Sequence, residues 1–239
     1  MKIATIDIGT NTVLLLIAEV EEGNIKTLSY EQRTPRIGKH IDSEGVIGKP
    51  AFARVIDVFS EYDKIIKKHK PDKVVAFGTS VLREATNKNE FVNFIKKETG
   101  IDIEILEGKD EAYWTYRGAI SGITSDKKMV VIDIGGGSTE ISEGTLKEVT
   151  CTNSLNVGAV RISERYFRNN PPGPAEIQLA SDFVNNAISK LTNCNYSDAT
   201  LIGVAGTPTT LASIDLGILQ FDVERISGYK LSYENINNI

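Results

Sequence analysis

An internal repeat constrains the fold of this chain more than any other feature of its sequence. The segment IDIGTNT begins at Ile6, and the similar segment IDIGGGS begins at Ile132. A second pair follows at nearly the same offset, with AFGTSVL from Ala76 and VAGTPTTL from Val204. Two matches in the same order at nearly equal spacing predict a duplicated unit with the element order βββαβα.

The first copy of this unit shows the expected order of strands and helices. Three β-branched, apolar runs predict strands over Ile3–Ile8, Val13–Val20 and Asn24–Gln32. Apolar residues at three- and four-residue spacing predict a helix over Lys49–His69, which Pro71 ends. The following segments read in turn as a strand, a helix, a strand and a helix: KVVAFG, NEFVNFIKKETG, IDIEIL and KDEAYWTYRGAI.

After Gly122 the same order begins again. KMVVIDIGGGSTEISEG predicts two strands around a glycine turn, and LKEVTCTNS predicts a third. Two helices, GAVRISERYF and AEIQLASDFVNNAISKL, precede the strand ATLIGVAG and a final helix. The fold class expected is therefore α/β, with two duplicated domains over residues 1–118 and 119–239, mixed sheets flanked by helices, and a ligand cleft between the domains. The second copy lacks a counterpart of IDIEIL, so we expect its C-terminal part to be missing.

Composition excludes several function classes. The net charge of −5 gives no overall attraction to nucleic acid or to an anionic membrane. The apolar stretch TVLLLIAEV is far shorter than the roughly 20 residues that a membrane-spanning helix needs. The chain opens on a strand-like run without a signal-type segment, so a cytoplasmic location is expected. Cys151 and Cys194 fit no metal-binding pattern, and we expect both to be reduced in an intracellular protein.

The glycine turn of the second copy has the composition of a phosphate-binding loop. Asp133 ends an apolar strand, and a carboxylate in that place is a typical oxygen ligand of Mg²⁺. The glycines that follow let backbone N–H groups approach an anion, and Ser138 and Thr139 add hydroxyl donors. A simple β-hairpin turn is the alternative. The second occurrence of the pattern favours phosphate binding.

Other phosphate-binding and catalytic motifs do not fit. The segments GKPA and GKDE lack the Ser or Thr that follows Lys in a Walker A loop. DIGGGSTE lacks the third glycine of a dinucleotide fingerprint, and a strand-like segment follows it where that motif needs a helix. The two histidines, His40 and His69, do not lie in catalytic sequence contexts.

Several segments in order along the chain resemble the Ppx/GppA family of exopolyphosphatases and guanosine pentaphosphate phosphatases. They are IDIGTNTVLLLIAEV, RTPRIGKHIDSEGVIG, GTSVLREATN, LEGKDEAYWTYRGAI, VIDIGGGSTEI, LNVGAVRISERY and GVAGTPTTLA. The resemblance runs from Lys2 to about Leu231 and implies two ribonuclease-H-like domains of the actin-like ATPase fold. The family continues for several dozen residues, including an R-A-D-x-I segment, beyond the last residue of this sequence.

The resemblance also implies the catalytic and metal-binding residues. Glu111, in the segment KDEA, matches the glutamate that activates water, and Asp110 is the upstream acid of that motif. Asp133 and Glu140 match the acidic cleft residues associated with Mg²⁺ and with water positioning. Asp7, the corresponding acid of the first copy, is expected to join them as a metal ligand. An ordinary acid in the first turn of a helix is the alternative for Glu111.

The phosphate-binding residues implied by the resemblance come from both copies of the repeat. They are Thr10, Asn11, Arg83, Gly135, Gly136, Gly137, Ser138, Gly206 and Thr207. Arg83 would bind a non-bridging oxygen through two guanidinium N–H groups, and a salt bridge on a helix surface is its alternative role.

These observations leave three hypotheses for function. The first is an exopolyphosphatase that removes terminal phosphates from inorganic polyphosphate, using Mg²⁺ and a water activated by Glu111. The second is a guanosine pentaphosphate (pppGpp) 5′-phosphohydrolase, and the third is a non-catalytic phosphate or nucleotide sensor. An ATP-dependent kinase is a weaker fourth. The expected partner is the polyphosphate or pppGpp substrate, without nucleic acid or membrane, and a homodimer stays open.

Overall fold

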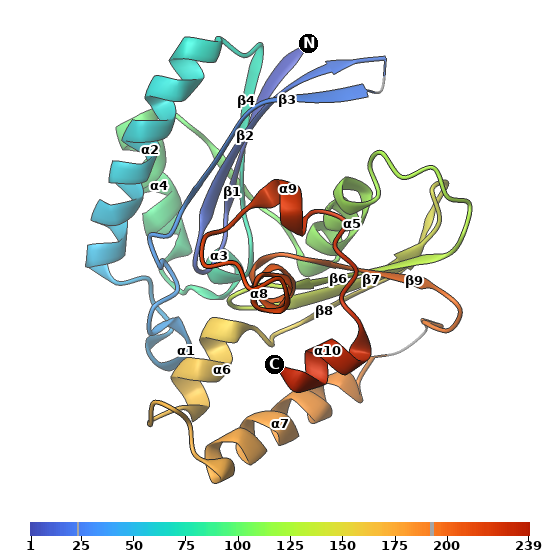
Figure 1. The fold of residues 1–239 in the computed structure, drawn as a ribbon. Coiled ribbons are helices and arrows are strands. Elements are labelled where there is room, and N and C mark those ends of the chain that lie inside the picture. The colour runs from blue at the N-terminus through green and yellow to red at the C-terminus, as the bar shows by residue number, and fades with distance from the viewer. Residues whose placement is uncertain (23, 192–193) are drawn as a thin grey trace. The chain divides into compact units, whose positions relative to one another are not determined.

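The computed structural model describes residues 1–22, 24–191 and 194–239, which pack as two compact units (Figure 1). Unit 1 consists of Met1–Gly108 and Val160–Asn185. Unit 2 consists of Lys109–Ala159 and Asn186–Ile239. The boundary predicted after residue 118 falls within helix α5 (Gly108–Ala119).

Unit 1 contains a five-stranded mixed sheet in the order β3-β2-β1-β4-β5. Strand β1 pairs antiparallel with β2 and parallel with β4, β2 pairs antiparallel with β3, and β4 pairs parallel with β5. The strands are β1 (Lys2–Ile8), β2 (Val13–Glu21), β3 (Asn24–Arg33), β4 (Lys73–Gly78) and β5 (Ile103–Ile105). The predicted strands of the first copy are thus confirmed.

Helices α2 and α4 cover one face of this sheet (Figure 1). Helix α2 (Lys49–His69) has the predicted bounds, and its apolar stripe packs against the alternating inward residues of β1 and β2. Burial of this stripe supplies most of the stability of the helix. The buried Tyr62 hydroxyl donates to the Val13 carbonyl over 2.7 Å and so fixes the helix on the sheet. The remaining helices of this part are α1 (Ile41–Glu44), α3 (Ser80–Glu84) and α4 (Lys88–Thr99).

Two helices from the second half of the sequence also belong to unit 1. They are α6 (Ala159–Tyr166) and most of α7 (Pro174–Ile188). Arg161 of α6 is 8% exposed and donates to Asp42 over 2.5 Å and to Glu84 over 2.6 Å. A buried guanidinium needs such carboxylate partners, so these ion pairs fix α6 beside α1 and α3.

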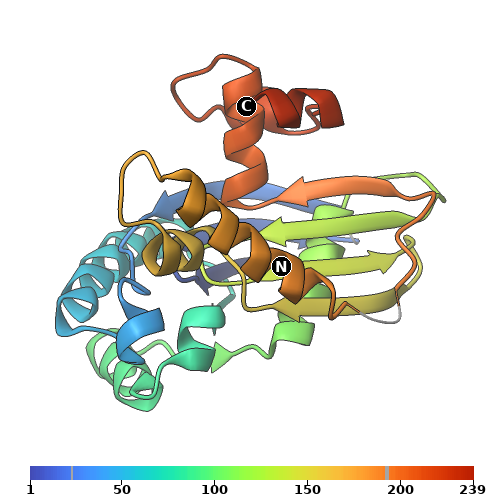
Figure 2. The same ribbon diagram turned by 90° about the horizontal axis from the view of Figure 1, so that it is seen from below.

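Unit 2 contains a four-stranded sheet that repeats the order of the first (Figure 2). Its order is β8-β7-β6-β9, with β6 antiparallel to β7, β7 antiparallel to β8, and β6 parallel to β9. The strands are β6 (Met129–Ile134), β7 (Thr139–Gly144), β8 (Val149–Leu155) and β9 (Thr200–Val204). The matching orders and directions confirm the duplicated α/β architecture.

The helices of unit 2 lie against this sheet and beyond its edge strand. Tyr116 of α5 is fully buried and packs with Met129 and Val131 of β6. From β9 the chain enters α8 (Gly206–Asp215) and continues to α9 (Val223–Ile226) and α10 (Tyr233–Asn238) (Figure 2). None of the helices in the described ranges combines the length and apolarity that a bilayer crossing requires.

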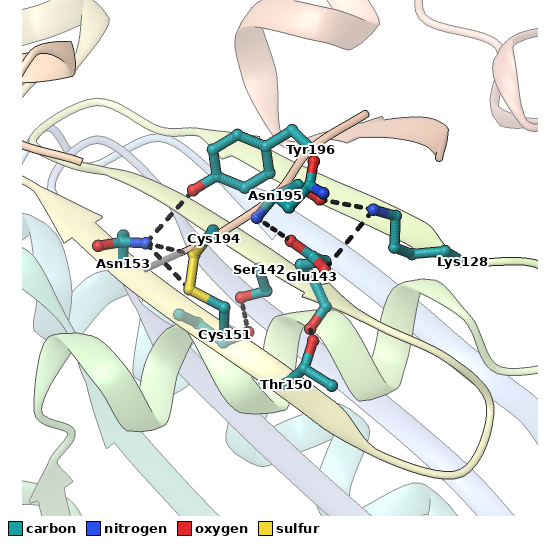
Figure 3. Close-up of a disulfide and its surroundings, with 10 residues drawn as sticks. Lys128, Ser142, Glu143, Thr150, Cys151, Asn153, Cys194, Asn195 and Tyr196 are labelled. Carbon is teal, nitrogen blue, oxygen red and sulfur yellow. Dashed lines mark hydrogen bonds and ion pairs between the residues drawn. A yellow bond between two sulfur atoms is a disulfide. The ribbon is translucent and has the colours of Figure 1, made fainter. Parts of the chain in front are cut away.

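The prediction of two reduced cysteines is wrong, because Cys151 and Cys194 form a disulfide (Figure 3). The bond joins β8 to the segment before β9, across 43 residues of sequence, with 5.7 Å between the Cα atoms. Asn153 donates to Cys194 Sγ over 3.0 Å, and the Asn195 N–H donates to Glu143 over 2.8 Å (Figure 3). The disulfide and these bonds hold the segment before β9 onto the sheet.

We predict that reduction of this disulfide destabilises the protein. Without the bond, the unfolded chain gains the conformational entropy that a closed loop of this length would deny it. The free energy of unfolding should therefore fall by about 4 kcal/mol. Urea unfolding with and without dithiothreitol measures the difference. Cys194→Ser should match the reduced wild type and show no response to dithiothreitol. Equal midpoints for oxidised and reduced wild type would contradict the prediction.

Candidate active site

Two loops lie at the same edge of the sheet in unit 2. The parallel strands β6 and β9 end beside one another, since Asp133 is paired with Val204. The glycine turn of residues 135–138 follows β6, and Gly206 begins α8 directly after β9. Ligands of open α/β sheets bind beyond the carboxyl ends of the strands. This edge is therefore where the geometry of unit 2 favours a ligand.

Two carboxylates lie side by side at this edge of the sheet. Asp133 on β6 lies directly opposite Glu140 on β7 in the antiparallel ladder. Glu140 is only 3% exposed, and its Oε1 accepts a hydrogen bond of 2.7 Å from the Ser154 hydroxyl of β8. Paired residues on neighbouring strands point to the same face, so the two acids act on one ligand space.

A third carboxylate comes from helix α5. Glu111 lies in its first turn, and the buried Ser142 hydroxyl of β7 donates to the Ala112 carbonyl over 2.9 Å. This bond fixes the start of the helix on the strand that carries Glu140. The charge of Glu111 acts on both Asp133 and Glu140. The structure thus brings together the three residues predicted to be catalytic.

Burial and mutual repulsion raise the pKa values of two of these acids. Burial, followed by the Glu111 charge, raises the pKa of Asp133 to about 6. Burial, Glu111 and Asp133 raise the pKa of Glu140 to about 8, against the opposing effect of hydrogen bonds from Ser154 and Ser138. Strongly raised carboxyl pKa values in one cluster are typical of functional sites.

The donor set fits a hard cation that completes its coordination from other sources. Among the residues that the structure describes, no group of three side chains encloses a metal ion unaided. Mg²⁺ is usually held by one or two carboxylates together with water and substrate phosphates. Asp133 and Glu140 supply that number of carboxylates, and a cation between them would relieve their repulsion.

The glycine turn is held by bonds from both sides. The Gly135 N–H donates to the Ser138 carbonyl over 3.0 Å, and the Ala159 N–H donates to the Gly135 carbonyl over 3.0 Å. The Thr139 hydroxyl donates to the Val157 carbonyl over 2.7 Å. The turn is therefore shaped by the segment that follows β8, and its backbone is restrained before any ligand binds.

Gly158 belongs to this site, although the sequence analysis did not single it out. A Cβ atom at Gly158 would lie 2.6 Å from the Gly137 nitrogen and would also overlap the Gly136 carbonyl. Only glycine permits such a close approach of two backbone segments. The available signal was the glycine in LNVGAV, one of the segments that carry the resemblance.

The second predicted turn of unit 2 begins with a strained residue. Ala205 has φ of +67°, a conformation that costs of order 1–3 kcal/mol for a residue other than glycine. Gly206 and Thr207 then form the first turn of α8, where backbone N–H groups carry partial positive charge. The Thr209 hydroxyl donates to the Ala205 carbonyl over 2.8 Å and supports this conformation.

The other predicted site residues belong to unit 1. Asp7 lies near the end of β1, opposite Leu14, and Thr10 and Asn11 form the turn between β1 and β2. The Thr10 carbonyl accepts the Gly38 N–H over 2.8 Å. Arg83 lies on α3, and its Nη1 donates to the Leu106 carbonyl over 3.0 Å. These contacts fix the backbone of the turn and the direction of the guanidinium.

We predict that Glu140→Gln stabilises the metal-free protein at alkaline pH. A raised folded-state pKa means that the stability contributed by the protonated carboxyl is complete below about 4.5 and is lost as the pH rises through about 8. Glutamine cannot ionise, so the gain should reach several kcal/mol at pH 8.5 and be small at pH 4.5.

Unfolding in EDTA at both pH values measures this difference. The exposed Glu148, beyond the far end of β7, provides a matched control in Glu148→Gln, which should show no such pH dependence. An equal effect of Glu140→Gln at both pH values would show that burial does not govern the protonation of this residue.

We predict that Gly158→Ala displaces the glycine turn and destabilises the protein by roughly 1–3 kcal/mol, because the new methyl group overlaps backbone atoms. Hydrogen exchange of the amides of residues 135–138 should become faster. Gly118→Ala is the control, since its Cβ would meet no atom within 4 Å. Unchanged exchange in Gly158→Ala would contradict the close packing.

Comparison with known proteins identifies relatives over nearly the whole chain. The model of the Ppx/GppA phosphatase family matches residues 16–238. The bifunctional 3-dehydroquinate synthase/phosphatase of Fusobacterium nucleatum is 35% identical over 98% of this chain and 37% of its own length. Exopolyphosphatase 2 of Mycobacterium tuberculosis is 30% identical over 94% of this chain and 74% of its own length.

Two further relatives are an enzyme named for a different substrate and a protein of known crystal structure. The guanosine-5′-triphosphate,3′-diphosphate pyrophosphatase of Photobacterium profundum is 27% identical over 99% of this chain and 49% of its own length. The crystal structure of an exopolyphosphatase from Cytophaga hutchinsonii is 29% identical, with a TM-score of 0.88 over all of this chain and 78% of that chain. The chain therefore spans between about a third and four fifths of these relatives, and it belongs to the Ppx/GppA phosphatase family.

Proposed function

We propose that this chain carries the catalytic residues of an exopolyphosphatase, which hydrolyses the terminal phosphoanhydride bond of inorganic polyphosphate. The observation that carries the proposal is the cluster of Glu111, Asp133 and Glu140 beside a glycine turn in unit 2. A fold that only bound phosphate would gain nothing from a third negative charge beside these two acids. Membership of the Ppx/GppA family supports the same reaction class.

Glu111 is the proposed general base. As a water oxygen attacks the terminal phosphorus, one water proton passes to the Glu111 carboxylate, and an O–P bond forms. The anhydride P–O bond on the opposite side breaks, and its electrons stay with the shortened polyphosphate. The products are inorganic phosphate and a chain one phosphate shorter.

Asp133 and Glu140 are the proposed metal ligands of unit 2. Bound Mg²⁺ would neutralise charge on these acids and on the phosphate oxygens. Both carboxyl groups would bind the cation in their ionised form, and the Ser154 hydroxyl donates to Glu140 Oε1 and holds its orientation. A metal-binding role of Asp7, which belongs to unit 1, stays a prediction from the sequence.

The proposed phosphate contacts use backbone donors more than side chains. Backbone N–H groups of the turn 135–138 would bind phosphate oxygens at the end of β6, except that of Gly135, which donates to the Ser138 carbonyl. Gly206 and Thr207 would do so at the start of α8. Phosphate-binding roles of Thr10, Asn11 and Arg83, which belong to unit 1, stay predictions from the sequence. The Gly135–Ser138 bond holds the glycine turn, and the Thr209–Ala205 bond holds the start of α8.

Hydrolysis of pppGpp by the same residues is the second candidate function. It is favoured by the likeness to the guanosine-5′-triphosphate,3′-diphosphate pyrophosphatase of Photobacterium profundum. Both substrates end in a phosphoanhydride, so the cluster serves either one. A non-catalytic sensor is the third candidate. Such a sensor would bind polyphosphate or pppGpp without hydrolysing it.

Phosphate release distinguishes these functions. With Mg²⁺, wild type should release phosphate from polyphosphate faster than from pppGpp, and Glu111→Gln should be slower by about 10²–10⁴-fold because the base is lost. Glu148→Gln, which changes the same charge at an exposed position of unit 2, should keep the wild-type rate.

Each contrary result favours a different candidate. Faster release from pppGpp would support the second function. Binding of polyphosphate without release from either substrate would support the sensor. A wild-type rate in Glu111→Gln, with an active wild type, would remove Glu111 from the role of base.

A further inference from the structure

Ser154 contacts the acidic cluster from a strand that the sequence analysis did not connect with it. It lies on β8, directly opposite Glu140 of β7 in the antiparallel ladder. Its hydroxyl donates to Glu140 Oε1 over 2.7 Å, beside a carboxylate that is almost fully buried. Because a serine hydroxyl has one proton, this bond commits its only donor to Glu140.

The bond acts on a side chain that is otherwise repelled by its neighbours. Glu111 and Asp133 are both negative charges acting on Glu140, whereas the hydroxyls of Ser154 and Ser138 stabilise its ionised form. A carboxylate offers about four lone-pair positions on two oxygens. The Ser154 hydroxyl takes one of these positions and leaves the others for further ligands.

The duplicated sheet shows that the fold does not require this pair. In unit 1 the cross-strand neighbours at the same place are Asp7, Leu14 and Gln32. In unit 2 they are Asp133, Glu140 and Ser154. The same strands pair in the same order with leucine and glutamine in place of the buried acid and its hydroxyl. The acid and the serine thus occur together in one copy and are both missing from the other.

We propose that Ser154 is a positioning residue of the site, which holds the Glu140 carboxylate by Oε1 and so presents it to Mg²⁺ and the phosphate. This inference rests on the proposed phosphohydrolase function. Outer residues that orient metal ligands typically contribute about 10–100-fold to metal affinity or activity. Ser154 acts through Glu140 and does not itself touch the substrate.

Three variants at Ser154 and one control variant, all of the full chain, test this role. Ser154→Thr keeps the hydroxyl, and Ser154→Val has nearly the same shape without it; both residue types suit a strand. Ser154→Ala removes the hydroxyl with the least change in volume. Thr152→Val is the matched control, since Thr152 lies on the same strand, opposite Ser142 and two residues from Ser154.

Calorimetric titration with Mg²⁺ in the presence of inorganic phosphate gives a readout that does not depend on turnover. We expect Ser154→Val and Ser154→Ala to bind Mg²⁺ about 10–100-fold more weakly, and Ser154→Thr and Thr152→Val to bind it as wild type does. In phosphate release, the same two weakened variants should lose kcat, with KM changed less than threefold at saturating Mg²⁺. Circular dichroism checks that each variant is folded. If Ser154→Ala is unfolded, the comparison of Ser154→Thr with Ser154→Val decides the role of Ser154.

The results separate this inference from the proposed function. If wild type releases no phosphate, the proposed function fails, and Mg²⁺ binding by the Thr and Val variants alone decides the role of Ser154. If wild type is active but Ser154→Val equals it in Mg²⁺ affinity and kcat, the role of Ser154 is overturned. Equal losses in Ser154→Thr and Ser154→Val, or no Mg²⁺ binding by wild type, would also overturn it.

Discussion

The repulsion among Glu111, Asp133 and Glu140 is the constraint on which unit 2 depends. Burying carboxylates costs free energy, and burying several together costs more. The Ser154 hydroxyl donates to Glu140 and so stabilises its charge. The Ser142 hydroxyl donates to the Ala112 carbonyl and so holds the start of α5, and with it Glu111, beside the other two acids. A protein that only needed a stable sheet would place apolar residues here, as unit 1 does with Leu14. The cost is compatible with the usual exchange of stability for activity at functional sites.

The repeat makes the division between scaffold and site visible within one chain. Both sheets place an acid at the end of the first strand and a turn after it, so that part of the pattern belongs to the shared architecture. The buried second acid and its serine occur at this place in unit 2, where unit 1 has Leu14 and Gln32. Two sheets of the same strand order thus differ in a few side chains, which the strand pairing holds in register.

Much of this fold could be predicted from the sequence because its elements have strong local signals. The apolar stripe of Lys49–His69 gave the bounds of α2, and the glycine turns located the ends of β1 and β6. The family resemblance alone was enough to group Glu111, Asp133 and Glu140 in one site. The pairing of Ser154 with Glu140 depends on strand register, and register depends on which face is buried over the whole sheet.

The disulfide and the placement of α6 were beyond prediction for a related reason. Cys151 and Cys194 are separated by 43 residues, and two isolated cysteines have no spacing pattern that distinguishes a pair from two free thiols. Arg161 finds Asp42 and Glu84 at separations of 119 and 77 residues. No local preference reports such contacts, because they arise only when distant segments pack.

The membership of Val160–Asn185 in unit 1 has a consequence for how this protein can be divided. The backbone passes from one unit to the other three times, so neither unit is a continuous stretch of the gene. A cut anywhere between residues 109 and 159 would separate α6 from the carboxylates that neutralise Arg161. The C-terminal piece alone would keep the Arg161 cation without its counter-charges, and the N-terminal piece alone would keep Asp42 and Glu84 without the guanidinium.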